Sequence, residues 1–141
     1  MKDFYNANIE SFKINSVDLQ IGLHVAVFMS ESWHRAKILK FSDPLIRVFF
    51  IDFGSVDEIE HKNIRYLKEE FLNIPSIAQR GVLAFIQPKH PKNFWSNEAK
   101  LFFHDNLSNK TVSAKFFYVN TFDNSYYIGI KPKADSSVTQ E

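Results

Sequence analysis

Three stretches rich in valine, isoleucine and phenylalanine follow one another in the segment 21–55, and their close spacing is the strongest constraint on the fold. Residues 23–29, 33–41 and 45–53 have the composition of β-strands. Met29-Ser-Glu-Ser32 and Ser42-Asp-Pro44 separate them, and residues of these types favour turns. The spacing therefore predicts a three-stranded meander.

Two further short strands are expected at 56–59 and 63–67. Five closely connected antiparallel strands are the number that closes into a small, strongly bent barrel. Residues 68–74 then predict a single helical turn that ends before Pro75, because the residue before a proline is disfavoured in the α region. We therefore expect a barrel over 21–67, preceded by a lead-in over 1–20.

The second half of the chain combines a strand, a helix and a hairpin. A strand is expected over 80–87, and apolar residues at helical spacing predict a helix over 95–107, with Ser96 as its N-cap. Residues 111–120 and 125–131 form a predicted hairpin, and 132–141 has the polar composition of a flexible tail. The chain is thus predicted to be mainly β, of α+β class.

Composition excludes several classes of protein. A chain of 141 residues with 45% hydrophobic content and no cysteine can form one domain of one or two lobes, without disulfides or thiolate metal sites. Its five histidines are not spaced as metal ligands, and no cofactor is expected. The net charge of +1 gives no basic stripe, and no apolar run reaches the length of a membrane span. The polar start indicates no secretory signal, so an intracellular protein is expected.

Two motifs in the first half resemble the Tudor domain family. Trp33-His-Arg-Ala36 stands where that family has Trp-Tyr-Arg-Ala, and Phe50-Ile-Asp-Phe-Gly-Ser55 stands where it has Tyr-Ile-Asp-Tyr-Gly-Asn. Phe4-Tyr5, Phe71-Leu-Asn-Ile-Pro75 and Trp95-Ser-Asn-Glu-Ala99 resemble further parts of the extended Tudor domains of germline proteins. The resemblance implies a five-stranded, SH3-like Tudor barrel plus a partial lobe like a staphylococcal nuclease or OB fold.

The resemblance places the second lobe over 68–131, as part of the same extended unit. In the family, strands of that lobe precede the linker helix, whose end Phe4-Tyr5 resembles. Only residues 1–20 precede the expected barrel here, so these strands are expected to be absent and the chain to be truncated at its N-terminus.

By motif position, the resemblance implies an aromatic cage that binds methylated arginine. Methylation keeps the positive charge of the guanidinium but removes hydrogen-bond donors, so flat aromatic faces suit it better than a carboxylate. His34 replaces a tyrosine of the family, and Ser55 replaces an asparagine. The expected cage residues are Phe28, His34, Phe50, Phe53 and Ser55.

Arg35 and Asp52 are expected to pair, because either charge would be costly to bury alone in adjacent apolar strands. Their expected role is to hold the strands that carry the cage. Asp52 could instead be combined with His34 or Glu58 as an acid and a base, but these spacings supply no nucleophile or oxyanion site. We therefore expect a binding module and not an enzyme.

The expected partner, by resemblance, is an arginine-glycine-rich peptide of a Piwi or Argonaute-type protein, symmetrically dimethylated or unmodified. The resemblance further implies a monomeric scaffold domain of the piRNA silencing pathway, in perinuclear cytoplasmic granules of germ cells. Two alternatives stay open. One is a degenerate cage that binds its partner independently of methylation, and the other is a single-stranded RNA-binding module that uses Tyr118, Tyr126 and Tyr127.

Overall fold

The chain divides into two units, a barrel and a smaller sheet with a helix. A computed structural model describes residues 1–89 and 94–132, so the expected tail lies almost wholly outside the described residues. The first unit is Met1–Gln79, and the second begins at Arg80. Residues 68–79, expected with the second lobe, therefore belong to the first unit. Within the described residues, no helix is long and apolar enough to cross a membrane.

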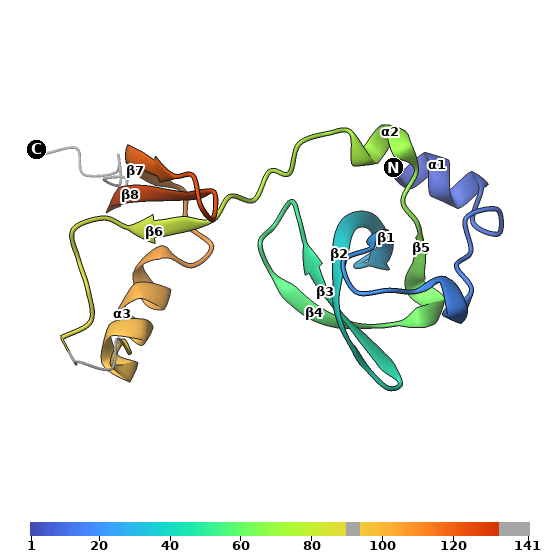
Figure 1. The fold of residues 1–141 in the computed structure, drawn as a ribbon, viewed down its shortest axis with the longest axis horizontal. Coiled ribbons are helices and arrows are strands. Elements are labelled where there is room, and N and C mark those ends of the chain that lie inside the picture. Colours follow the sequence, from blue (N-terminus) through green and yellow to red (C-terminus); the bar gives the residue numbers. More distant parts are fainter. Residues whose placement is uncertain (90–93, 133–141) are drawn as a thin grey trace, which may run out of the picture. The chain divides into compact units, whose positions relative to one another are not determined.

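The first unit is built around a five-stranded antiparallel sheet that curls round on itself (Figure 1). The strand order is β4-β3-β2-β1-β5, so the first four strands pair in chain order and β5 pairs with β1. The bounds are β1 (His24–Met29), β2 (Ser32–Ser42), β3 (Leu45–Phe50), β4 (Val56–Glu60) and β5 (Ile64–Tyr66). The predicted five-stranded barrel is confirmed.

Alternating residues of these strands form the core of the barrel. Val25 and Val27 of β1, Ala36 and Ile38 of β2, and Val48 of β3 are fully buried. Because successive side chains of a strand point to opposite faces, this spacing sends every second residue inward. The remaining members of the cluster are Ile14, Ile46, Phe50, Ile59 and Ile64.

A second apolar cluster joins the lead-in to the outside of the barrel. Helix α1 (Lys2–Ala7) brings the buried ring of Tyr5 against Trp33 of β2, where the two rings stack with centroids 4.9 Å apart and an interplanar angle of 29°. The Trp33 Nε1–H donates to Asn6 Oδ1 at 3.2 Å. Trp33 therefore packs within the first unit, on the face of β2 opposite to the core.

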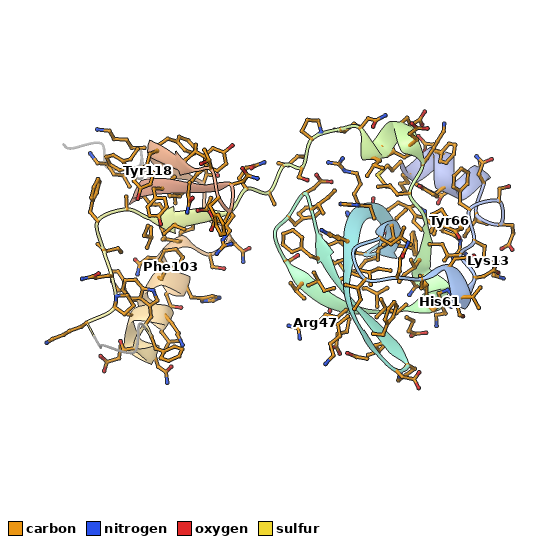
Figure 2. The ribbon with its side chains drawn as sticks, in the orientation of Figure 1. Lys13, Arg47, His61, Tyr66, Phe103 and Tyr118 are labelled. Carbon is orange, nitrogen blue, oxygen red and sulfur yellow. The ribbon has the colours of Figure 1, made fainter. Side chains whose placement is uncertain are left out.

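Hydrogen bonds attach the rest of the lead-in to β5 and to the short helix η2 (His61–Asn63). The Tyr66 N–H donates to Phe12 O at 2.8 Å, and His61 Nε2 lies 3.1 Å from Ile14 O. Figure 2 shows Lys13, His61 and Tyr66 in this region of the barrel. The lead-in, which includes η1 (Ser16–Asp18), is thus an integral part of the first unit.

The second unit contains a three-stranded sheet and one long helix. The sheet has the order β6-β8-β7, in which β6 (Gly81–Leu83) is parallel to β8 (Ser125–Pro132) and β7 (Val112–Asn120) is antiparallel to it. Helix α3 (Asn97–Leu107) begins after Ser96, whose Oγ accepts from Ala99 N–H as predicted. The strand expected over 80–87 is shorter in the structure, where β6 ends at Leu83, because the positive φ of 63° at Phe85 interrupts the extended backbone.

The hydroxyl of Tyr5 is expected to stabilise the first unit measurably. It donates to Tyr66 O at 2.8 Å and accepts from Lys68 N–H at 3.0 Å, so it joins α1 to the chain that leaves β5. Tyr5→Phe leaves both backbone groups without this partner, and we expect a loss of about 1–2 kcal/mol in the free energy of unfolding. A urea titration, monitored through the NMR signals of β1–β5, measures this loss in unfolding free energy.

Val17→Ala is the control for this substitution, because Val17 is an exposed side chain of the same lead-in. It should change the free energy of unfolding by no more than about 0.5 kcal/mol. Equal effects of the two substitutions would contradict the role given to the Tyr5 hydroxyl.

Candidate functional site

A tight turn after β3 sets the position of the expected cage. The Gly54 N–H donates to Phe50 O at 2.8 Å, and the Phe50 N–H donates to Ser55 O at 2.9 Å. Gly54 has a φ of 78°, in the left-handed region that glycine adopts without steric cost. The chain therefore reverses within this short segment, and the ring of Phe53 turns outward with 66% of its surface exposed.

Phe53 and His34 form the accessible part of the site. Their ring centroids are 5.3 Å apart with an interplanar angle of 74°, so the two rings meet edge to face. His34 is half-buried, and its Nε2 lies 3.2 Å from Met29 O, which limits rotation of the imidazole. Ser55 is exposed two residues after Phe53.

Phe50 lies beneath this pair as part of the core. Its ring meets His34 at right angles, with centroids 6.0 Å apart, but only 1% of its surface is exposed. Phe50 therefore supports the imidazole from below and, in this structure, offers no open face to a ligand.

Phe28 lies on the other face of the sheet. In the β1–β2 pairing, Phe28 is opposite Trp33 and Val27 is opposite His34. Directly opposite residues share a face, and neighbouring residues alternate, so Phe28 points to the side of Trp33. Its ring centroid is 5.2 Å from that of Trp33. The structure thus brings His34, Phe50 and Phe53 together and leaves Phe28 out.

Met29, and not Phe28, lies on the face of β1 that points to the side of His34. It is two residues after Val27 and therefore on the same side as His34, and it is half-buried against the barrel core. The reason is the turn at Ser30 and Glu31, where both residues have positive φ, so that Met29 pairs with Ser32. The turn lies where the sequence predicted one, but neither residue is one of the glycines or asparagines that usually adopt positive φ in such a turn.

Arg35 uses all five of its N–H donors to hold the site together. It is 4% exposed, and its Nε and one terminal nitrogen donate to the two carboxylate oxygens of Asp52, at 2.9 and 2.5 Å. The remaining donors reach three backbone carbonyls, those of Phe71, Ile74 and Pro75. The expected pair is thus also a clamp on the segment that follows the barrel, and we call it the Arg35 clamp.

The clamped segment lies against the turn that carries Phe53. Ala78 N–H donates to Ile51 O at 3.1 Å, and Ile77 N–H donates to Asp52 Oδ1 at 3.3 Å. Hydrogen bonding to the Arg35 guanidinium lowers the pKa of Asp52 from its ordinary value. A carboxylate held in its charged form fixes the turn on one side, and the backbone of 77–78 fixes it on the other.

Comparison of the chain with models of known protein families agrees with what the motifs and the fold indicate. The family model described as Tudor domain matches residues 1–84. The chain belongs to the Tudor domain family. A curated relative, human RING finger protein 17, is 37% identical over 90 residues, which are 63% of this chain and 6% of the relative. The chain thus spans a small part of the length of that relative.

Solved Tudor domains share the fold. An extended Tudor domain of human TDRD1, in complex with a symmetrically dimethylated peptide, matches 94% of this chain and 67% of its own, with a TM-score of 0.76 at 21% identity. Domain TD3 of mouse TDRD1, in complex with a MILI peptide containing dimethylarginine, matches 83% of this chain and 61% of its own, with a TM-score of 0.70 at 22% identity. The predicted fold class, that of an extended Tudor domain, is confirmed.

Removal of the Arg35 guanidinium should destabilise the first unit strongly. Arg35→Leu leaves the Asp52 carboxylate and three backbone carbonyls without these donors, and we expect a loss of about 3–5 kcal/mol in the free energy of unfolding. The control is Arg47→Leu, because Arg47 is an exposed arginine of the neighbouring strand β3 (Figure 2). It should cost no more than about 1 kcal/mol. Similar losses in both variants would contradict the clamp.

Acid should weaken the same interaction. Because the folded pKa of Asp52 is lowered, its contribution to stability is present above the ordinary carboxyl pKa of about 4 and is lost as the pH falls below it. We expect Asp52→Asn to reduce the fall in unfolding free energy between about pH 5 and pH 2. Glu58→Gln, which removes an exposed carboxylate of β4, should leave that fall unchanged. The same fall in all three proteins would show that Asp52 does not carry it.

Proposed function

We propose that this Tudor domain is a non-catalytic module that binds peptides containing methylated arginine, with His34 and Phe53 as the ring walls of its site. The observation that carries the proposal is the edge-to-face pair of these rings, 5.3 Å apart, at an exposed turn held by the Arg35 clamp. A methylated guanidinium over such rings gains about 0.5–2 kcal/mol per face from cation–π attraction. Two similar solved domains support it, one in complex with a MILI peptide containing dimethylarginine and one with a symmetrically dimethylated peptide.

Met29 is the third wall in this proposal. Its side chain lies on the same face of the sheet as His34, at the end of β1. A thioether is apolar and polarizable, so it packs against the methyl groups of the ligand but adds no aromatic face. The site would therefore have fewer rings than the cage expected from the motif, and its affinity would depend strongly on Phe53.

The exposed hydroxyl of Ser55 is the remaining polar group at this rim, at the position where the family has an asparagine. It can donate or accept one hydrogen bond to the guanidinium or to the peptide backbone. A binding mode that does not depend on methylation is the second candidate. It is favoured by the burial of Phe50, which removes one ring face from the expected cage.

The biological role is part of the proposal. A peptide rich in arginine and glycine, from a Piwi-type protein, fits the site chemically, and the MILI peptide bound to mouse TDRD1 supports this kind of partner. The parent protein would then act as a scaffold in piRNA silencing, in perinuclear granules of germ cells. Its other domains would determine the assembly, because this chain corresponds to a small fraction of its curated relatives.

Calorimetric titration with one arginine-glycine peptide tests the site. The peptide is used unmodified, symmetrically dimethylated and asymmetrically dimethylated. We expect the domain to prefer a methylated form, and Phe53→Ala to weaken that binding about 2- to 30-fold, which corresponds to one lost ring face. Phe53 is chosen because it is exposed, whereas replacing the buried Phe50 would damage the core.

Phe28→Ala is the matched control, since it removes a phenylalanine from the adjacent strand end but from the opposite face. It should change the affinity less than about twofold. Equal binding of all three peptides, with no effect of Phe53→Ala, would establish the methylation-independent mode. If none of the three peptides bound, both the methylation-dependent and the methylation-independent mode would be refuted.

A further inference from the structure

The three-stranded sheet of the second unit has two faces of different chemistry. On one face, Phe116 of β7 lies opposite Ile128 of β8, and the centroid of its ring is 5.7 Å from that of the Tyr126 ring. On the other face, Tyr118 lies opposite Tyr127, with stacked rings 4.2 Å apart. The three tyrosines proposed from the sequence as a base-stacking platform are therefore divided, because Tyr126 points away from the other two.

Aromatic rings continue along the side of Tyr118 and Tyr127. Phe117 lies over Gly129, where an added Cβ would be 3.1 Å from its ring, so the glycine leaves room for the ring. Phe85 then packs edge to face on Phe117, with centroids 4.7 Å apart. Phe85 is 82% exposed and has a φ of 63°, a conformation that is costly for a bulky residue. A strained backbone thus holds an exposed ring against this face.

Two lysines lie on the same side of the sheet. Lys115 is opposite Gly129, and Lys131 is two residues further along β8, so the two are diagonal neighbours. The Lys115 Nζ lies 5.3 Å from the ring centroid of Phe117. The strands β6, β7 and β8 contain these two lysines and no aspartate or glutamate. We call this side the tyrosine face, made of Phe85, Lys115, Phe117, Tyr118, Tyr127 and Lys131.

We propose that the tyrosine face binds single-stranded nucleic acid. Tyr118 (labelled in Figure 2) is on the edge strand β7. Tyr127 covers one side of its ring, and 53% of the residue is exposed, so the other side is open. A base that stacks there extends the pair of rings, and stacking of this kind accepts every base. Lys115 is three residues along the strand, about 10 Å away, within reach of the phosphate of a neighbouring nucleotide.

Charge decides between this ligand and a peptide of the kind bound by the cage. A methylarginine peptide is cationic and would be repelled by Lys115 and Lys131, whereas phosphates are attracted to them. Desolvation and the neighbouring Tyr127 raise the pKa of Tyr118, so its phenol stays neutral beside an anionic ligand. The two sites thus take ligands of opposite charge.

Fluorescence anisotropy of the full chain with a labelled uridine RNA of about 12 nucleotides tests the proposal. We expect saturable binding at low salt that weakens as salt is added. Tyr118→Ala should weaken it about 5- to 150-fold, since one stacked base is lost. Joint replacement of Lys115 and Lys131 by glutamine should lower the slope of log affinity against log salt by about 1.4, the value for two phosphate contacts on a single strand.

Phe116→Ala is the matched control, because it removes an exposed ring from the same strand on the opposite face. It should leave RNA affinity unchanged, and so should Phe53→Ala in the first unit, which separates this proposal from the peptide site. Absence of binding at low salt, or equal losses in Tyr118→Ala and Phe116→Ala, would overturn the proposal. It would also be overturned if the dimethylated peptide, and not RNA, shifted the NMR signals of Tyr118 and Tyr127.

Discussion

The geometry of the candidate site depends on how one buried arginine distributes its hydrogen bonds. Arg35 lies in the middle of the barrel sheet, and its five donors are divided between the Asp52 carboxylate and the backbone of 71–75. Two parts of the chain far apart in sequence are thereby held by one planar group, which a lysine could not replace. Asp52 directly precedes the turn that presents Phe53, and the N–H groups of Ile77 and Ala78 donate to Asp52 and Ile51, so the position of the turn is set before any ligand arrives.

Much of the fold could be predicted from local sequence signals, because the strands are short, close together and rich in β-formers. The N-cap at Ser96 and the bend at Gly54 were also predictable from local signals, because each depends on one residue type at one position. The place of residues 68–79 in the first unit could not be predicted in this way. It depends on contacts such as the hydrogen bonds from Arg35 to the carbonyls of Phe71, Ile74 and Pro75, which residues distant in sequence form only in the folded chain. Composition carries no information on such contacts.

The candidate site was predictable in part. The two motifs implied His34, Phe50 and Phe53, whose rings lie together in the structure, whereas Phe28, also implied by motif position, points to the other face of β1. The side-chain period of a strand is two, so the neighbours Phe28 and Met29 point to opposite faces. The turn at Ser30 and Glu31 sets that register through backbone conformations that these residue types seldom adopt.

The candidate site is divided between core and surface, and this division determines which of its residues can be exchanged. Phe50 belongs to the barrel interior, and a change there would endanger folding, whereas Phe53 and Ser55 are exposed and His34 and Met29 are only half-buried. Substitutions at the rim therefore have a small cost in stability. Exchange of tyrosine for histidine or of asparagine for serine at this rim is therefore compatible with an intact barrel.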